Sequence, residues 1–394
     1  MSTLLLWLLI AIAPPTAPDT LVVCPPQLRI ALAPWEEHRA AQGHLLQVIA
    51  PPRTALELRQ LLSTAARSKQ LKYVVLIGDV DTVPTCYAEA KVNILWGSEP
   101  TIATDEPYAD VDDDGVPDIA VGRIPADSRA ELQAVVRKLL QYEHAPVANP
   151  CRRQLDVVAG VGGFGIVADT LIEASARSVF TQVVPASYSV RRLKADPEAT
   201  CEQISAGSLA WIYLGHGLPT MLDVAATPHG PKPILAVSDV AKLQCGANCP
   251  LAVLVACYTG AIDARTDSLA EKLVLEERGP IAAIAATRVT MPYGNSVFGC
   301  ELLRAAFRNS PGNFGDVWLR AQRQTLAPAA ESDSLRSSLD AVARGVSPPP
   351  ADLAAERREH VLLYQLLGDP LLRLNYPAAE HQRIAATSEE TIAK

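Results

Sequence analysis

Short apolar runs recur along this chain, and stretches with helical periodicity separate them. The first three runs, at 20–24, 45–50 and 73–79, alternate with helical stretches at 26–41 and 53–69. A strand, helix, strand alternation places its strands side by side in a parallel sheet, because each helix crosses back over one face. The pattern therefore predicts an α/β fold.

The alternation continues through the rest of the chain. A fourth strand is expected at 119–123, and the linker-like segment 144–153 then precedes a second series of apolar runs and a helix at about 168–181. The runs of this series lie at 155–161, 183–190, 209–215, 251–257 and 280–286. We expect two side-by-side subdomains, 18–147 and 148–376, each with a mainly parallel sheet flanked by helices.

Both ends of the chain differ from this pattern. Residues 1–17 contain an apolar core from Leu4 to Ala13, which has the length of a signal-peptide core and is too short to cross a bilayer. The segment predicts export, to the periplasm or outside the cell, without a stable membrane span. No Lys or Arg precedes the core, so a misplaced start codon explains it equally well. Residues 377–394 are predicted to form a polar tail.

Charge and cysteine content restrict the classes of function. The formal net charge of −8 and the lack of a basic run argue against a nucleic-acid surface. If one of the eight cysteines is a free nucleophile, the remaining odd number cannot all pair. Cys245 and Cys249 could close a small disulfide loop or stay reduced.

Two of the apolar runs end on residues that can carry out chemistry. One leads into His216 and the other into Cys257, 41 residues later. The carboxyl ends of parallel strands share one sheet edge, so the two side chains are expected to meet there. A thiol beside an imidazole is a nucleophile with its base. Taken singly, each residue is more often structural, the cysteine as a small buried hydrophobe and the histidine as a loop residue.

The order of these two blocks resembles the caspase–gingipain clan of cysteine peptidases, and further segments resemble its gingipain (C25-type) family over about residues 18–376. These segments are YVVLIGDVDTVPT (73–85), TDEPYADVDDDGVPDIAVGRIP (104–125), ELQAVVRKLLQYE (131–143), SLAEKLVLEERGPIAAIAATRVT (268–290) and YQLLGDPLLRL (364–374). The resemblance implies a caspase/gingipain-like fold and a cysteine endopeptidase that acts on polypeptides through a thioester acyl-enzyme. A catalytically inactive peptide-binding scaffold and a transpeptidase using the same acyl-enzyme are the alternatives.

The resemblance also implies roles for individual residues. Cys257 attacks the substrate carbonyl, His216 protonates the leaving amine, and the backbone N–H groups of Gly217 and Cys257 form the oxyanion hole. A glycine suits that position because it lets a carbonyl approach its amide closely. The family's acidic partner of the histidine would fall in VVAGVGGFG (157–165), which contains no carboxylate. We therefore expect a Cys-His dyad, for which no cofactor is required.

Asp169 matches, within a residue or so, the acid at the base of the specificity pocket in Arg-specific gingipains. The resemblance implies a preference for Arg or Lys before the scissile bond, with 286–295 as the pocket wall. A carboxylate placed for the dipole of the following helix is the alternative. From the sequence, the direction of the Arg288 side chain stays open.

An acidic segment, DVDDDGVPD, has the alternating carboxylates of a calcium loop at Asp110, Asp112, Asp114 and Asp118. Val121 stands where such a loop would have its bidentate Glu. Structural Ca²⁺ is therefore a candidate, and a solvated acidic turn before the strand at 119–123 is the alternative.

Overall fold

A computed structural model describes residues 17–146, 149–162, 166–308, 312–346 and 352–374. Side chains at 166–169, 171–172, 308 and 346 are also outside the description. The predicted leader, apart from residue 17, and the predicted polar tail lie outside the described residues.

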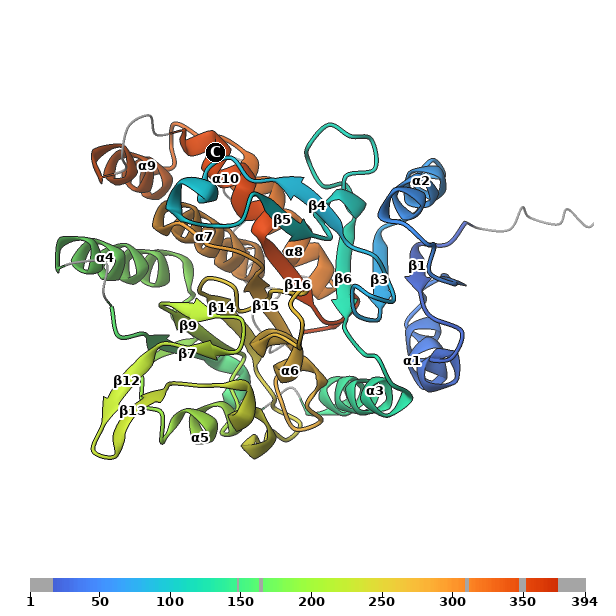
Figure 1. Ribbon diagram of the computed structural model, residues 1–394, viewed down its shortest axis with the longest axis horizontal. Helices are drawn as coiled ribbons and strands as arrows, with labels where there is room; N and C mark the ends of the chain where they lie inside the picture. The colour runs from blue at the N-terminus through green and yellow to red at the C-terminus, as the bar shows by residue number, and fades with distance from the viewer. Residues whose placement is uncertain (1–16, 147–148, 163–165, 309–311, 347–351, 375–394) are drawn as a thin grey trace, which may run out of the picture.

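The fold is organised around one ten-stranded sheet with the order β2-β1-β3-β6-β16-β15-β14-β9-β7-β8 (Figure 1). The strands are β1 (Thr20–Val23), β2 (Leu46–Ile49), β3 (Tyr73–Ile77), β6 (Ala120–Ile124), β7 (Gln154–Ala159), β8 (Ser189–Leu193), β9 (Ala210–Leu214), β14 (Leu251–Val255), β15 (Ala282–Ala286) and β16 (Tyr364–Leu367). Strands within each half are parallel, and β16 joins the halves, antiparallel to β15 and parallel to β6. The expected α/β architecture is confirmed.

Helices cover both faces of the sheet (Figure 1). α1, α3 and α6 pack in a row on one face, and α4, α7, α8 and α10 pack together on the other. The helices are α1 (Arg29–Ala41), α2 (Ala55–Ala66), α3 (Arg129–His144), α4 (Ile166–Val183), α5 (Thr200–Ser205), α6 (Leu269–Leu275), α7 (Pro292–Arg308), α8 (Phe314–Leu326), α9 (Ser334–Val346) and α10 (Leu353–Leu363). Because both faces are covered, the central strands are buried on both sides, and β14 and β15 are apolar throughout.

Local sequence explains where several helices begin and end. Thr54 and Glu57 form a capping box at the start of α2, and Ser128 and Glu131 form another at the start of α3. Each box satisfies backbone N–H groups that the first helical turn leaves without a partner. After α1 the chain reverses at Gly43, whose φ of +94° is accessible to glycine at little cost.

The structure differs from the sequence expectation at two strands. The run at 183–190 is the end of α4 followed by a turn in which Tyr188 N–H donates to the Pro185 carbonyl, and β8 begins only at Ser189. Pro185 has no N–H for a sheet ladder, which explains the late start. β16 was not predicted as a strand, because its few residues directly follow a helix.

Three small hairpins complete the fold: β4 (Cys86–Glu89) with β5 (Thr101–Thr104), β10 (Gly217–Leu218) with β11 (Met221–Leu222), and β12 (Val224–Thr227) with β13 (Gly230–Pro233). All eight cysteines are free, so Cys245 and Cys249 form no disulfide. Within the described ranges, none of the helices has the length and apolar content needed to cross a membrane. β6 of the first predicted subdomain pairs with β16 of the second, so one sheet extends through both. The subdomain boundary at 147/148 stays a prediction.

Candidate active site

His216 and Cys257 follow neighbouring parallel strands and leave the sheet at the same edge. Leu214 at the end of β9 pairs with Val255 at the end of β14, and each reactive residue lies two positions further on. The Gly215 N–H still donates to the Val255 carbonyl at 3.2 Å, so the two segments remain adjacent beyond the last paired residues of β9 and β14. Both reactive residues are partly exposed. The sheet register therefore brings the predicted nucleophile and base to one place.

Gly217 packs directly against the nucleophile's backbone. A Cβ at this position would lie 2.7 Å from the Cys257 carbonyl oxygen and 2.6 Å from the Thr259 side chain. Both distances are shorter than a van der Waals contact, so any larger residue would push the segment at Gly217 away from the segment after β14. A glycine is thus required here by close approach, independently of any role of its amide.

The Cys257 sulfur is surrounded by polar groups from the segment after β15. The Thr290 N–H points at Sγ at 3.3 Å, and the Thr290 carbonyl oxygen lies 3.8 Å from it. Asn295 Nδ2 donates to Thr290 Oγ1 at 2.9 Å, and the Tyr364 hydroxyl donates to Asn295 Oδ1 at 2.8 Å. The backbone of Thr290 thus contacts the Cys257 sulfur through both its N–H and its carbonyl group. This network was not predicted, because its members come from three separate elements.

His360, to which the sequence assigned no role, holds the backbone next to this network. Its Nε2 accepts the Met291 N–H at 3.1 Å, and its Nδ1 donates to the Glu356 carbonyl at 2.8 Å. Complete burial lowers the pKa of His360 from 6.5 to about 4, so the ring is neutral at physiological pH. Gly294 leaves room for the ring, since a Cβ there would overlap it.

Asp223 is a functional candidate that sequence reasoning missed. Its Oδ2 accepts the Tyr213 hydroxyl at 2.6 Å, the His216 N–H at 3.1 Å and the Val161 N–H at 3.2 Å. Burial first, and then the Asp223 carboxylate, raises the pKa of Tyr213 far above its usual range, so the phenol remains a donor. Gly215 gives the carboxylate space, because a Cβ there would lie 2.7 Å from Oδ2. The sequence contains no motif that links Asp223 to His216.

The Arg288 side chain forms an ion pair with the Asp263 carboxylate. Its Nη1 and Nη2 donate to the two oxygens of Asp263 at 2.8 and 2.6 Å. The Arg288 carbonyl accepts the N–H of Tyr258, which has a φ of +61° that non-glycine residues rarely adopt. Arg288 thus supports the chain just after the nucleophile.

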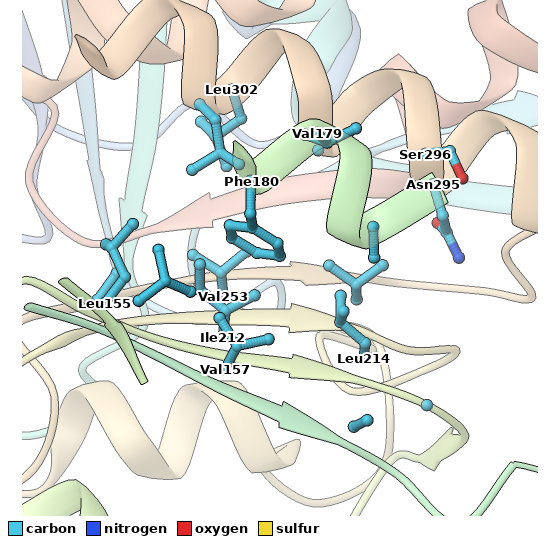
Figure 2. A pocket seen from close by; sticks show the side chains of 18 of the residues that line it. Leu155, Val157, Val179, Phe180, Ile212, Leu214, Val253, Asn295, Ser296 and Leu302 are labelled. Atoms are coloured by element: carbon cyan, nitrogen blue, oxygen red, sulfur yellow. The ribbon is translucent and has the colours of Figure 1, made fainter. Parts of the chain in front are cut away.

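An apolar cavity of about 590 Å³ lies beside the nucleophile, with Cys257 and Thr290 among the residues that line it. Figure 2 shows Leu155, Val157, Ile212 and Val253 on the sheet side, with Phe180 from α4 and Leu302 from α7 facing them. Among the lining residues that the structure describes, Glu173 is the one carboxylate, and it pairs with Arg177 at 2.8 Å. Asp169 is the fourth residue of α4, and its side chain lies outside the described part of the structure.

The acidic loop gathers three of its four predicted ligands. Asp110, Asp112 and Asp118 each offer one carboxylate oxygen within 4.8 Å of the others, an arrangement that suits the oxygen preference of Ca²⁺. Asp114 instead accepts the Val116 N–H at 2.8 Å, so its carboxylate caps the turn. Burial raises the pKa of Asp110, which disfavours its charged form when no cation is nearby.

Comparison with known proteins agrees with this fold. The sequence matches the family model of peptidase family C25 over residues 13–375. The fold is similar to that of the complex of Porphyromonas gingivalis RgpB pro- and mature domains, with a TM-score of 0.67 and 18% identity over 90% of this chain and 79% of that chain. It is also similar to the Arg-specific cysteine proteinase gingipain R, with a TM-score of 0.65 and 18% identity over 92% of this chain and 79% of that chain.

No curated protein matches the sequence. At 18% identity the solved structures establish the fold alone, whereas the family model extends over nearly the whole chain. The protein has the fold of the gingipains. Its match to a peptidase family implies that its substrates are polypeptides. This chain therefore belongs to peptidase family C25, the gingipain-like cysteine peptidases.

Proposed function

We propose that this protein is an endopeptidase that cleaves peptide bonds with a dyad of Cys257 and His216. The observation that carries the proposal is the sheet register, which sets both residues two positions beyond the paired ends of β9 and β14. Proton transfer requires a nucleophile and its base to lie within hydrogen-bond reach, and adjacent strand ends allow this. The Thr290 N–H directed at the sulfur supports the same assignment.

In the proposed reaction, the Cys257 thiol gives its proton to His216 as Sγ forms a bond to the substrate carbonyl carbon. The C–N bond then breaks as the His216 imidazolium gives that proton to the leaving amine. The product is a thioester. A water molecule then attacks the thioester, His216 takes up a proton, and the C–S bond breaks to release the carboxylate and the thiol. The backbone N–H groups of Gly217 and Cys257 are the proposed donors to the oxyanion.

We propose that Asp169 confers a preference for Arg or Lys before the scissile bond. Support comes from its place in the first turn of α4, since later residues of this helix line the cavity beside Cys257. Bound Ca²⁺, if present at Asp110, Asp112 and Asp118, would stabilise the loop before β6 and would have no part in the chemistry. The apolar leader supports a secreted or periplasmic location, and the charge of −8 supports a partner other than nucleic acid.

Labelling with a peptidyl electrophile at pH 7 tests the proposal. We expect stoichiometric modification of Cys257 and a large loss of rate in His216→Ala. Cys151 is also partly exposed and serves as the matched control, so Cys151→Ala should label like the wild type. Labelling that is slow, or equal in His216→Ala, would favour the non-catalytic peptide-binding alternative. Added amines that divert the acyl group would instead identify a transpeptidase.

A further inference from the structure

Three consecutive apolar side chains are exposed on the turn between β4 and β5. Ile94, Leu95 and Trp96, which we name the apolar turn, are 41%, 77% and 53% exposed and belong to the short 3-10 helix η1 (Asn93–Trp96). Single exposed apolar residues are common on protein surfaces and need no explanation. Three adjacent ones of this size, including a tryptophan, indicate a surface that contacts another molecule.

Hydrogen bonds to α10 hold the backbone at the start of the apolar turn. The Glu359 carboxylate, itself almost fully buried, accepts the N–H groups of Val92 and Asn93 at 2.8 Å each, and that of Lys91. A buried carboxylate that loses its donors pays a large desolvation cost, so these contacts keep the backbone ordered. The exposed side chains are therefore presented on a rigid support and cannot fold inward.

Both ends of this turn are attached to the surroundings of the nucleophile. At one end Asn93 Nδ2 donates to the Val289 carbonyl at 3.4 Å, one residue before Thr290. At the other end the hydroxyl of Tyr258, the residue after Cys257, donates to Glu99 at 2.9 Å. Glu99 follows the last residue of the apolar turn by three positions, which amounts to at most about 10 Å of chain.

We propose that the apolar turn is a binding site for apolar side chains of the polypeptide substrate, a few residues away from the scissile bond. The proposal rests on the proposed function for the position of the substrate, which extends from Cys257. An extended peptide advances about 3.3 Å per residue, so a peptide that extends from Cys257 past Tyr258 and Glu99 can reach the apolar turn. Leucine and tryptophan contribute large apolar areas when a ligand covers them.

The experiment measures peptide binding to the Cys257→Ala protein, which holds a peptide without turning it over. Two fluorescent peptides of equal length are compared by anisotropy, one with leucines a few residues from the scissile bond on either side and one with serines at those positions. We expect the leucine peptide to bind more tightly. Adding Leu95→Ser and Trp96→Ser should weaken its binding by at least about tenfold and remove the difference between the peptides.

A matched control replaces two equally exposed apolar residues elsewhere. Ile30 on α1 and Leu56 on α2 are 71% and 62% exposed, and Ile30→Ser with Leu56→Ser should keep the difference between the peptides. A difference that survives removal of the apolar turn, or that the control pair also removes, overturns the proposal. So does an absence of binding by both peptides. Absence of electrophile labelling at Cys257 in the wild-type protein, with the binding difference intact in the Cys257→Ala protein, would overturn the dyad alone.

Discussion

The carboxylate of Asp223 accepts the backbone N–H of His216 at 3.1 Å. The same oxygen binds Tyr213 on β9 and Val161 after β7, so one side chain connects the ends of two strands to the histidine loop. A carboxylate with several donors holds its partners more firmly than neutral hydrogen bonds do. Asp223 is thus placed to position His216 through the main chain.

Replacement of Asp223 is expected to slow catalysis more than it weakens substrate binding. Asp223→Ala leaves three donors without an acceptor and frees the His216 loop, so kcat should fall by at least about tenfold with a smaller change in KM. Asp223→Asn keeps one acceptor oxygen and should recover most of the rate. Steady-state kinetics of both variants check this. Equal losses in the two would show that the negative charge, and not the geometry, matters.

Cys257→Ala and His216→Ala should each abolish peptide hydrolysis while the protein still unfolds cooperatively. Both residues lie beyond the strand ends and are partly exposed, so neither substitution opens a cavity in the core. Turnover and thermal melting measured on the same samples separate lost chemistry from lost structure. Turnover that persists in either variant at the wild-type rate would contradict the dyad.

Calcium is expected to raise the melting temperature through the acidic loop, and a chelator should lower it. Asp112→Ala removes one of the three clustered carboxylates and should abolish this sensitivity. Asp114→Ala removes only a turn contact to Val116, so it should leave the response to calcium in place. Melting curves with calcium and with chelator provide the measurement. Curves that ignore both additions would leave a solvated acidic turn as the explanation.

Asp169 is expected to set the preference for a basic residue before the cut. A carboxylate pairs with guanidinium through two hydrogen bonds, so Asp169→Ala should lower kcat/KM for Arg peptides at least about tenfold and spare Leu peptides. The ratio of kcat/KM for paired Arg and Leu peptides is the quantity to compare. An unchanged ratio would assign Asp169 to the helix start, and the apolar cavity walls would then favour apolar side chains.

His360 is expected to make stability depend on acid. Its pKa is about 4 in the fold and 6.5 for an ordinary exposed histidine, so the unfolded chain binds the extra proton first as the pH falls. Above pH 6.5 the neutral His360 makes its full contribution to the free energy of unfolding. This contribution is lost between pH 6.5 and 4, and the loss is about 3 kcal/mol at most. His360→Gln retains an acceptor for the Met291 N–H and should flatten this decline. Denaturant unfolding of both proteins at pH 7 and 4 gives the difference.

The carboxylates Glu106 and Glu271 have the opposite effect in the same pH range. Burial raises the pKa of each to about 7. The stability that their protonated forms contribute is therefore lost as the pH rises from 4.5 to 7. The comparison of wild type with His360→Gln cancels both, because the two proteins share them. A decline with acid that is equally steep in the two proteins would show that His360 is not its source.

The sequence by itself determined the class of fold and the family, and it pointed to the two residues of the proposed dyad. Apolar runs separated by helical stretches predict a parallel sheet because each helix crosses back over one face and returns the chain in the same direction. His216 and Cys257 were recognisable because each follows such a run, and the shared sheet edge then follows from parallel geometry. The acidic loop was also visible, since its ligands lie within one short segment.

Only the tertiary structure decided which groups surround those two residues. Asp223, Thr290 and His360 act through contacts between elements distant in sequence, and no local pattern encodes such distances. The same reason separates Asp114 from its three neighbouring carboxylates, because the backbone direction of the turn, and not the spacing of the aspartates, decides which oxygens converge. Local patterns specify strands and helices, and the packing of those elements specifies the site.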